Sequence, residues 1–185
     1  MSIKAAIKRH VRAGRLFPLE MKMGSDPWVR GIFFSGEVKA LLDGPWTEPE
    51  NGVRVLQLQA DLESFVRGQS VVMCPEPFEA DDAFIGRLHP SEERVWDIRS
   101  RHPSPGLRLF GHFAAPDIFV AFDWGPRSRD WNGKQELGGR HSPHWEIAIR
   151  DCRERWTVLF PDHEALNGVE VHEFVTSKAI SRRSA

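Results

Sequence analysis

The sequence predicts an α+β fold, with an antiparallel, strand-rich core and one long C-terminal amphipathic helix at about residues 143–159 packed on it. Apolar and polar residues alternate along three neighbouring segments between residues 95 and 124, which is typical of strands. Apolar residues recur at helical spacing between residues 145 and 159. The 185 residues contain no internal repeat and no clear linker, so we expect a single domain over residues 1–185.

The first 46 residues predict a short N-terminal element followed by strands. Ile3, Ile7 and Val11 recur every four residues, which favours a short helix over residues 1–12, with a mobile arm as the alternative. Residues 16–46 contain apolar runs broken by glycine and proline, and predict short strands joined by turns. Within them, residues 38–42 fit either a strand or a helix.

The middle of the chain predicts a loop, a strand and a short helix in succession. Residues 47–52 are polar and predict a loop, and residues 53–59 mostly alternate with a period of two, which predicts a strand. Asp61 is then expected to cap a short helix over residues 62–66. Residues 70–74 predict a further strand, and residues 75–82 an acidic turn.

Three strands joined by tight turns follow, and they predict an antiparallel meander. The turns are the segments "HPSPG" at 102–106 and "AAPD" at 114–117. We expect one set of side chains to be mostly buried: Trp96, Ile98, Leu107, Leu109, Phe113, Ile118, Val120 and Phe122. Alternation places a second set together on the other side: Arg99, Arg101, Arg108 and His112.

The C-terminal part predicts a loop, the long helix, a strand and a tail. Residues 132–142 predict a surface loop, after which Ser142 is a helix cap and Pro143 the first helical residue. The apolar stripe of the helix is Trp145, Ala148, Ile149, Cys152, Trp156 and Leu159. Residues 168–176 alternate and predict a last strand, and residues 177–185 predict a polar tail.

Composition limits the possible partners. The chain has 25 Lys and Arg against 26 Asp and Glu, so any site for nucleic acid must be a local patch. Two cysteines are too few for a disulfide framework, and no apolar run is long enough to span a membrane. We therefore expect a soluble, cytoplasmic protein that does not interact with membranes.

The meander carries the strongest candidate site. Between Arg94 and Trp131 there are six arginines and four aspartates. A guanidinium group suits phosphate, and a histidine in such a field can transfer protons without a metal. The candidate binding residues are Arg101, Phe110, Trp124, Arg127, Arg129 and Trp131, the aromatic rings being placed to stack on bases. The alternative is an ordinary solvated sheet face, with the arginines paired to Asp97, Asp117 and Asp123.

The same meander resembles the core of RelE/ParE-type toxins, including the HigB branch, over about residues 95–129. The segments that carry the resemblance are "WDIR" at 96–99, "LRLF" at 107–110 and "IFVAF" at 118–122. The resemblance implies a small sheet packed by N-terminal helices and metal-independent cleavage of mRNA. It places Arg99 and Arg108 on the RNA face, and His112 is the third candidate catalytic residue.

Two other chemistries remain as alternatives. His141, His144 and Cys152, with His163 and His172 further on, offer zinc ligands, although Cys152 on the apolar stripe also fits a small buried residue. Cys74, at the end of an apolar strand, is a candidate nucleophile. The acidic segment with Glu76, Glu79, Asp81 and Asp82 offers carboxylates for a metal nuclease or forms a plain surface turn.

The function we expect is that of a cofactor-free macromolecule-binding protein from a mobile element, a phage or a bacterial defence or toxin–antitoxin system. Its partner is a protein or RNA, bound by the Arg, His and aromatic side chains of the meander. The alternatives are a metal-independent RNA-cleaving toxin that uses Arg99, Arg108 and His112, and a small zinc-binding protein.

Overall fold

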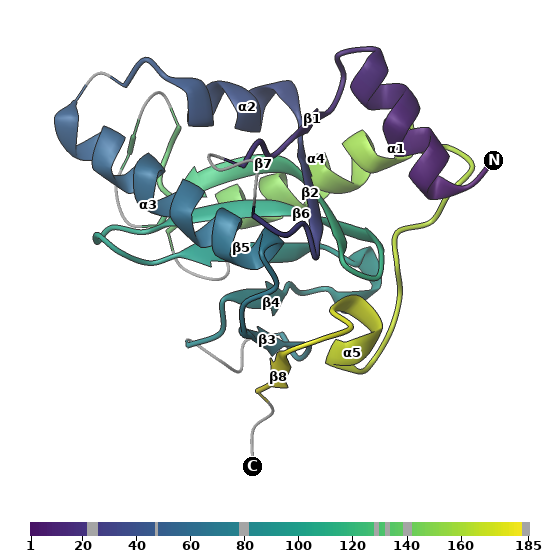
Figure 1. The fold of residues 1–185 in the computed structure, drawn as a ribbon. Coiled ribbons are helices and arrows are strands. Elements are labelled where there is room, and N and C mark those ends of the chain that lie inside the picture. The colour runs from purple at the N-terminus through teal and green to yellow at the C-terminus, as the bar shows by residue number, and fades with distance from the viewer. Residues whose placement is uncertain are drawn as a thin grey trace.

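A computed structural model of the chain describes residues 1–21, 26–46, 48–77, 82–127, 130–131, 134–138 and 142–182. These residues form an eight-stranded sheet and the helices around it (Figure 1). The helices are α1 (Ile3–Arg12), α2 (Gly36–Asp43), α3 (Pro49–Val66), α4 (Pro143–Leu159), α5 (Val171–Phe174) and the 3-10 helix η1 (Ser91–Glu93). The strands are β1 (Phe17–Pro18), β2 (Gly31–Phe34), β3 (Val71–Cys74), β4 (Ile85–Arg87), β5 (Trp96–Ser100), β6 (Leu107–Ala115), β7 (Ile118–Pro126) and β8 (Ala179–Ser181).

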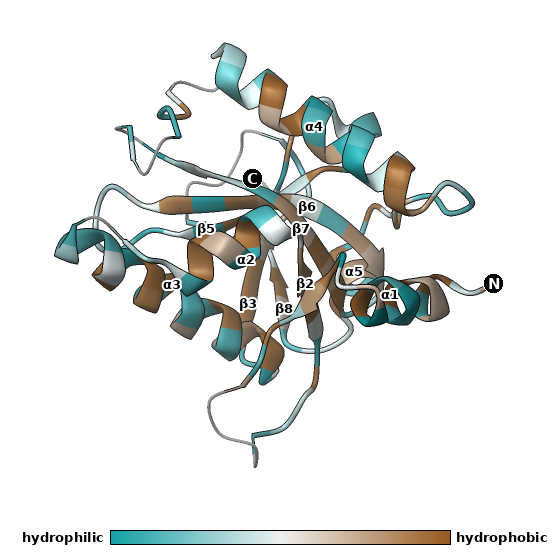
Figure 2. Ribbon diagram, turned by 90° about the horizontal axis from the view of Figure 1, so that it is seen from above, coloured by the Kyte–Doolittle hydropathy of each residue, from teal (hydrophilic) through white to brown (hydrophobic). Residues whose placement is uncertain are grey.

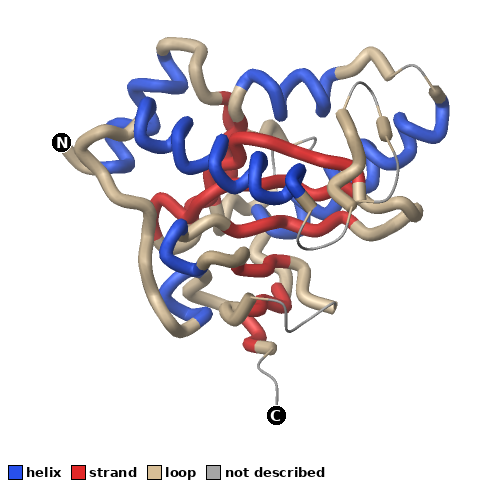
Figure 3. Tube along the Cα trace, turned by 180° about the vertical axis from the view of Figure 1, so that it is seen from behind, coloured by secondary structure: helices blue, strands red, loops and turns tan. Residues whose placement is uncertain are grey.

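The strand order across the sheet is β1-β2-β7-β6-β5-β4-β3-β8. Consecutive strands from β4 to β7 pair antiparallel, as do β1 and β2, whereas β2–β7, β3–β4 and β3–β8 are parallel pairs. The mostly antiparallel sheet confirms the α+β class and puts the predicted meander, β5 to β7, at its centre. Figure 3 shows the strands stacked down to β8, beside the C-terminus.

Helices cover both faces of the sheet. Figure 2 shows α4 on one side of the strands and α2 and α3 on the other. Trp96, Ile98 and Leu109 pack in the core on the α3 side, whereas Val120 and Phe122 pack in the core shared by α1 and α4. Of the eight meander residues expected to be mostly buried, seven are buried and Ile118 is half-buried. The buried residues therefore belong to two cores rather than to one.

The predicted loop at 47–52 and strand at 53–59 are wrong from Pro49 onward, because α3 is one continuous helix of 18 residues. Val55, Leu58, Leu62 and Phe65 are spaced by three or four residues and are buried, whereas Val53 and Leu56 are 56% and 50% exposed. The predicted strand would have put exposed Val53 and buried Val55 on the same face. Pro49 lies in the first helical turn, where a proline is tolerated.

The helix predicted at residues 143–159 is present as α4, and it buries Trp145, Ala148, Ile149, Cys152 and Trp156. The expectation of a single long helix is not confirmed, because α3 is of similar length. An ion pair joins α4 to α2, and Lys134, which precedes α4, extends it to β7. Arg155 donates to Glu37 at 2.6 Å, and Lys134 donates to Asp123 at 2.6 Å and also to Glu37.

The C-terminal assignments also change. Residues 168–176 do not form the predicted strand, because Val171 and Phe174 are buried at helical spacing in α5. A carboxylate oxygen of Glu173 accepts the backbone N–H groups of Val169 and Glu170 at the start of this helix. Part of the expected polar tail forms β8, which pairs with β3.

Two N-terminal segments for which the sequence left alternatives open, residues 1–12 and 38–42, contain helices. α1 occupies residues 3–12, and its N-cap Ser2 accepts the N–H of Ala5 at 3.3 Å. Residues 38–42 lie in α2. His10 of α1 is buried, and its Nε2 lies 2.7 Å from the Leu159 carbonyl oxygen at the end of α4.

The close contact between β6 and β7 leaves no room for a side chain at Gly111, and this leads to a testable prediction. A Cβ atom at this position would lie 2.0 Å from the Val120 carbonyl oxygen, which is backbone and has little room to move. We expect Gly111→Ala to lower the free energy of unfolding by about 1–3 kcal/mol or more, measured by urea denaturation. Gly36→Ala is the control and should cause no loss, because a Cβ atom there would lie 4.0 Å from the Phe17 ring, an ordinary contact distance. Equal stability of the Gly111 variant and the wild type would contradict this strand geometry.

Candidate functional site

The central strands bring four arginines to one end of the sheet, next to the loop formed by residues 101–106. Arg99 of β5 lies opposite Arg108 of β6, and Arg108 lies opposite Gly125 of β7. Arg101 follows β5 directly, and Arg127 follows β7 and donates its backbone N–H to the Gly106 carbonyl at 2.9 Å. The antiparallel register therefore collects side chains that are up to 28 positions apart in the sequence.

A buried carboxylate holds two of these arginines. Asp97 has no exposed surface, and its two oxygens accept hydrogen bonds from Arg99 Nε at 2.9 Å and from Arg108 NH1 at 2.8 Å. Gly86 of β4 lies opposite Asp97, and a Cβ atom there would come within 2.0 Å of Arg99 NH2. The missing side chain at Gly86 thus leaves the space in which the Arg99 guanidinium lies.

The arginines influence one another electrostatically. Burial lowers the pKa of Arg108 to about 10; Asp97 opposes this shift, and the charges of Arg99, Arg127 and Arg101 add to it. Arg108 is still protonated at neutral pH. The positive charges at this end of the sheet are therefore close enough to destabilise one another, and a bound anion would relieve that repulsion.

A depression of about 290 Å³ lies among these side chains, and we call it the arginine pocket. Its wall includes Ser100, Arg101, Ser104, Gly106, Arg108 and Arg127. Three of the described lining residues are cationic, two carry hydroxyl groups, and none is acidic. Such a set of donors suits an oxyanion, because guanidinium groups donate pairs of hydrogen bonds to phosphate or carboxylate oxygens.

Two contacts position the wall of the arginine pocket. Arg54 of α3, itself buried, donates from NH2 to the Ser104 carbonyl at 3.3 Å and so ties the loop to the helix. Arg127 donates from NH1 to the Gly138 carbonyl at 2.6 Å, and its guanidinium carbon lies 5.9 Å from the ring centre of Trp145. Arg54 was not recognised from the sequence because it lies in the segment predicted to be a strand.

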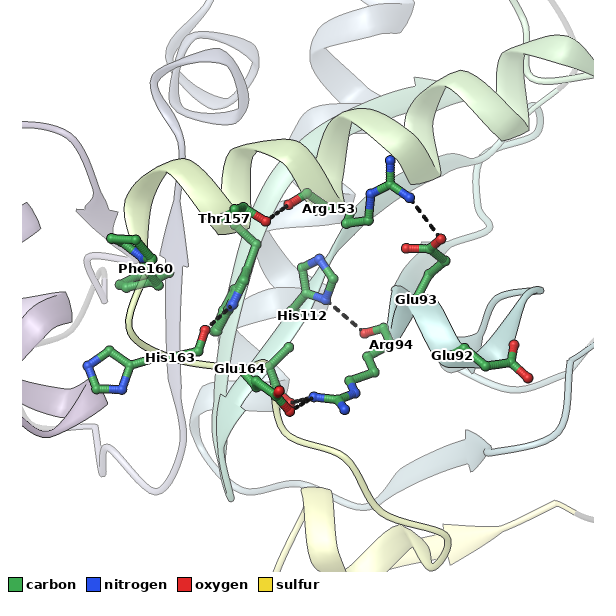
Figure 4. A pocket seen from close by; sticks show the side chains of 12 residues that line it. Glu92, Glu93, Arg94, His112, Arg153, Thr157, Phe160, His163 and Glu164 are labelled. Carbon is green, nitrogen blue, oxygen red and sulfur yellow. Dashed lines mark hydrogen bonds and ion pairs between the residues drawn. The ribbon is translucent and has the colours of Figure 1, made fainter.

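His112 does not join the arginines. It lies beneath α4 with 2% of its surface exposed, and its Nδ1 donates to the Arg94 carbonyl at 2.9 Å (Figure 4). Its ring packs on Trp156 and Phe122. His112 forms part of the wall of a different depression, of about 320 Å³, between α4 and the segment with Glu92 and Glu93. His112 therefore lies on the same face of β6 as Arg108 but lines a different depression from Arg101 and Arg108.

The aromatic residues proposed to stack on bases are also buried. Phe110, Trp124 and Trp131 are 0%, 5% and 6% exposed, so none offers a ring face to a partner in this conformation. Phe110 packs edge-on against Trp145, and Trp124 packs against Trp131. The face of β6 on which Phe110 lies, which was expected to be open, is covered by α4. Arg129 lies outside the described residues.

The alternative metal and thiol chemistries gain no geometric support. Cys152 and Cys74 are both buried, and burial raises the pKa of the Cys152 thiol well above its usual value. His144 Nδ1 lies 2.8 Å from the Glu136 carbonyl oxygen. No group of three or more His, Cys, Asp or Glu side chains that could hold a metal occurs among the described residues. His141, Glu79 and Asp81 lie outside them.

Comparison of the chain with protein-family models, with curated proteins and with solved structures found no match. The resemblance to RelE/ParE toxins therefore stays a prediction from the sequence. In the part of the chain that the structure describes, no helix combines the length and the apolar character needed to cross a membrane.

The buried Asp97 leads to a prediction about stability. Replacing it by asparagine removes the charge that balances Arg99 and Arg108, whose side chains are only 13% and 14% exposed. We expect Asp97→Asn to lower the free energy of unfolding by about 3–5 kcal/mol in urea denaturation. Asp43→Asn removes the partner of Lys39 on the surface and should cost less than about 1 kcal/mol. Similar losses in the two variants would show that Asp97 has no special role.

The buried His112 leads to a prediction about pH. Burial lowers the pKa of His112 from 6.5 to about 4, so the native protein keeps it neutral while the unfolded chain takes up a proton near pH 6.5. The resulting stability is present above pH 6.5 and is lost as the pH falls toward 4. We expect His112 to account for a loss of about 2 kcal/mol between pH 7 and pH 5, measured by denaturation at each pH.

His112→Gln tests this assignment, because glutamine does not titrate. Burial also lowers the pKa of His10, so the wild type has more than one source of acid sensitivity, and the difference between the two proteins isolates His112. A loss of stability with falling pH that is as steep in the variant as in the wild type would refute the assignment.

Proposed function

We propose that the protein binds RNA without a cofactor, through phosphate groups held in the arginine pocket. The observation that supports this proposal is the set of three cationic and two hydroxyl side chains around one depression, with no carboxylate among its described lining residues. RNA supplies the matching chemistry, because each phosphate presents oxygens to bidentate guanidinium donors.

The arginine side chains of the pocket are already held in fixed positions, and this favours binding. Asp97 and the sheet register fix Arg108, and Arg127 is fixed by Gly106 and Gly138. Donors that are already held in place lose less conformational entropy when a ligand binds. Because the overall charge is −1, attraction of a polyanion depends on local clusters of positive charge such as this one.

A protein partner is less well supported by the described surface. Interfaces between proteins usually have an apolar centre. Here the exposed large apolar side chains are spread over separate elements, for example Trp28 in a loop, Val53 and Leu56 on α3, and Val158 on α4. Positive charge is therefore a better guide to the partner than apolar surface is.

Metal-independent RNA cleavage by Arg99, Arg108 and His112 is the alternative that follows from the sequence resemblance. The position of His112 counts against its proposed proton-transfer role, because the ring is buried beneath α4 and its low pKa keeps it neutral at pH 7. We therefore favour binding over cleavage. RNA that stays intact during incubation with the wild-type protein in EDTA would support this choice. RNA fragments that form with the wild type but not with Arg108→Lys would instead support cleavage.

A matched pair of double variants tests the proposal. Arg101→Gln/Arg127→Gln removes two charges from the arginine pocket, and Arg150→Gln/Arg153→Gln removes two from the outer surface of α4. We expect the pocket variant to weaken binding of a labelled single-stranded RNA at least about tenfold in fluorescence anisotropy. The α4 variant should change binding much less, although both variants have the same net charge.

Salt dependence gives a second measurement on the same samples. Each phosphate contact contributes about 0.7 to the slope of log affinity against log salt for single strands, so the pocket variant should lose roughly 1 to 1.5 from that slope. Equal weakening in both double variants would indicate diffuse attraction rather than a site. A flat salt response in the wild type would favour a protein partner instead.

A further inference from the structure

A second depression adjoins the arginine pocket, and we call it the side pocket. It has a volume of about 210 Å³, and its described lining consists of Gln57 and Asp61 of α3, Asp82, Phe84 beside β4, Arg99, Arg101 and His102. Arg101 lines both pockets, and Ser100 and Arg101 are consecutive residues between them. A ligand that fills both depressions must therefore carry an anionic group directly beside a second group of different chemistry.

The side pocket supplies flat rings. Phe84 is half-buried and packs against the core on the α3 side, and His102 is exposed. Rings of this kind stack on the unpaired bases of single-stranded RNA. The side pocket thus offers a stacking surface that the buried Phe110, Trp124 and Trp131 do not provide.

The side pocket differs from the arginine pocket in carrying carboxylates. Asp61 Oδ1 accepts a hydrogen bond from Gln57 Nε2 at 2.8 Å, and Oδ2 accepts one from Ser100 Oγ at 2.7 Å. Asp82, also in the wall, is exposed and pairs with Arg182 Nε at 3.0 Å. A carboxylate oxygen accepts about two hydrogen bonds, so these groups keep capacity for a donor on a ligand.

The position of Asp61 links the two pockets physically. Its partner Ser100 also lines the arginine pocket, so one hydrogen bond connects the acceptor of the side pocket with the wall of the phosphate site. In a nucleotide, one sugar separates the base from its phosphate. Adjacent pockets that share Arg101 and are joined by the Ser100–Asp61 hydrogen bond match this arrangement.

We propose that the side pocket receives the base next to the phosphate held in the arginine pocket, and that it favours bases with an exocyclic amino group, cytosine and adenine, over uracil; this rests on the proposed RNA binding. Carboxylates accept hydrogen bonds from the amino group of cytosine or adenine. Uracil presents a carbonyl oxygen at the equivalent position of its ring, which the carboxylates of Asp61 and Asp82 repel. The two guanidinium groups in the same wall already donate to other acceptors, Arg99 to Asp97 and Arg101 to the Ala83 carbonyl.

Labelled 12-nucleotide oligomers of cytidine, adenosine and uridine test the preference by anisotropy. We expect the wild type to bind oligo(C) and oligo(A) about fivefold or more tightly than oligo(U). Asp61→Asn/Asp82→Asn should bring the three affinities close together, because an amide group can both donate and accept. Asn at position 61 can still accept from Ser100, and Asp82→Asn alone, at an exposed position, serves if the double variant does not fold.

The double variant gains two units of positive charge, so its control must do the same. Asp43→Asn/Glu154→Gln makes that change at exposed positions on α2 and α4, and it should raise all three affinities while keeping their ratios. Only a change in the ratios reports on the side pocket.

The outcomes separate the two proposals. Equal binding of the three oligomers by the wild type, still weakened by Arg101→Gln/Arg127→Gln, would overturn the side pocket and keep the RNA site. A preference for cytosine and adenine that persists in Asp61→Asn/Asp82→Asn would also overturn it, by placing recognition elsewhere. No binding of any oligomer would overturn the proposed function, and the side pocket with it.

Discussion

The cluster of arginines at one end of the sheet depends on one buried carboxylate, that of Asp97. Two guanidinium groups from neighbouring strands, Arg99 and Arg108, lie opposite each other in a partly desolvated place, and the charge of Asp97 compensates their mutual repulsion. Each oxygen of Asp97 accepts a hydrogen bond from one of the two guanidinium groups, and these bonds fix the direction in which both side chains leave the sheet. Asp97 accepts hydrogen bonds only from Arg99 and Arg108, so the charges of Arg101 and Arg127 keep the electrostatic potential around the pocket positive.

Much of the fold was predictable where one periodicity dominated. The meander and α4 follow simple spacings, and the structure contains both. Only the C-terminal part of α3, residues 62–66, was predicted as a helix; the part before it was missed because exposed Val53 and Leu56 interrupt the helical pattern of Val55 and Leu58 and imitate a strand. The covering of both sheet faces was also hidden, because apolar residues on the second face, such as Phe110, are interspersed with charged ones.

The candidate site was predictable in its charges but not in its boundaries. Arg99, Arg101, Arg108 and Arg127 come together because the strand register is regular there. His112 shares β6 with Arg108, but it lies beyond a register shift between Phe110 and Gly111 and under a helix that is distant in sequence. Ser104 and Arg54 were not found because their roles arise from a loop–helix contact that spans 50 positions.

The two outermost strands are very short. β1 has two residues, one of them Pro18, which has no N–H to donate, and β8 has three. Each edge thus offers another polypeptide only a few backbone groups for pairing, and this limits both aggregation through the sheet and recognition by adding a strand. Evolution can consequently change the partner of this protein mainly by replacing side chains at the end of the sheet, while the backbone framework stays the same.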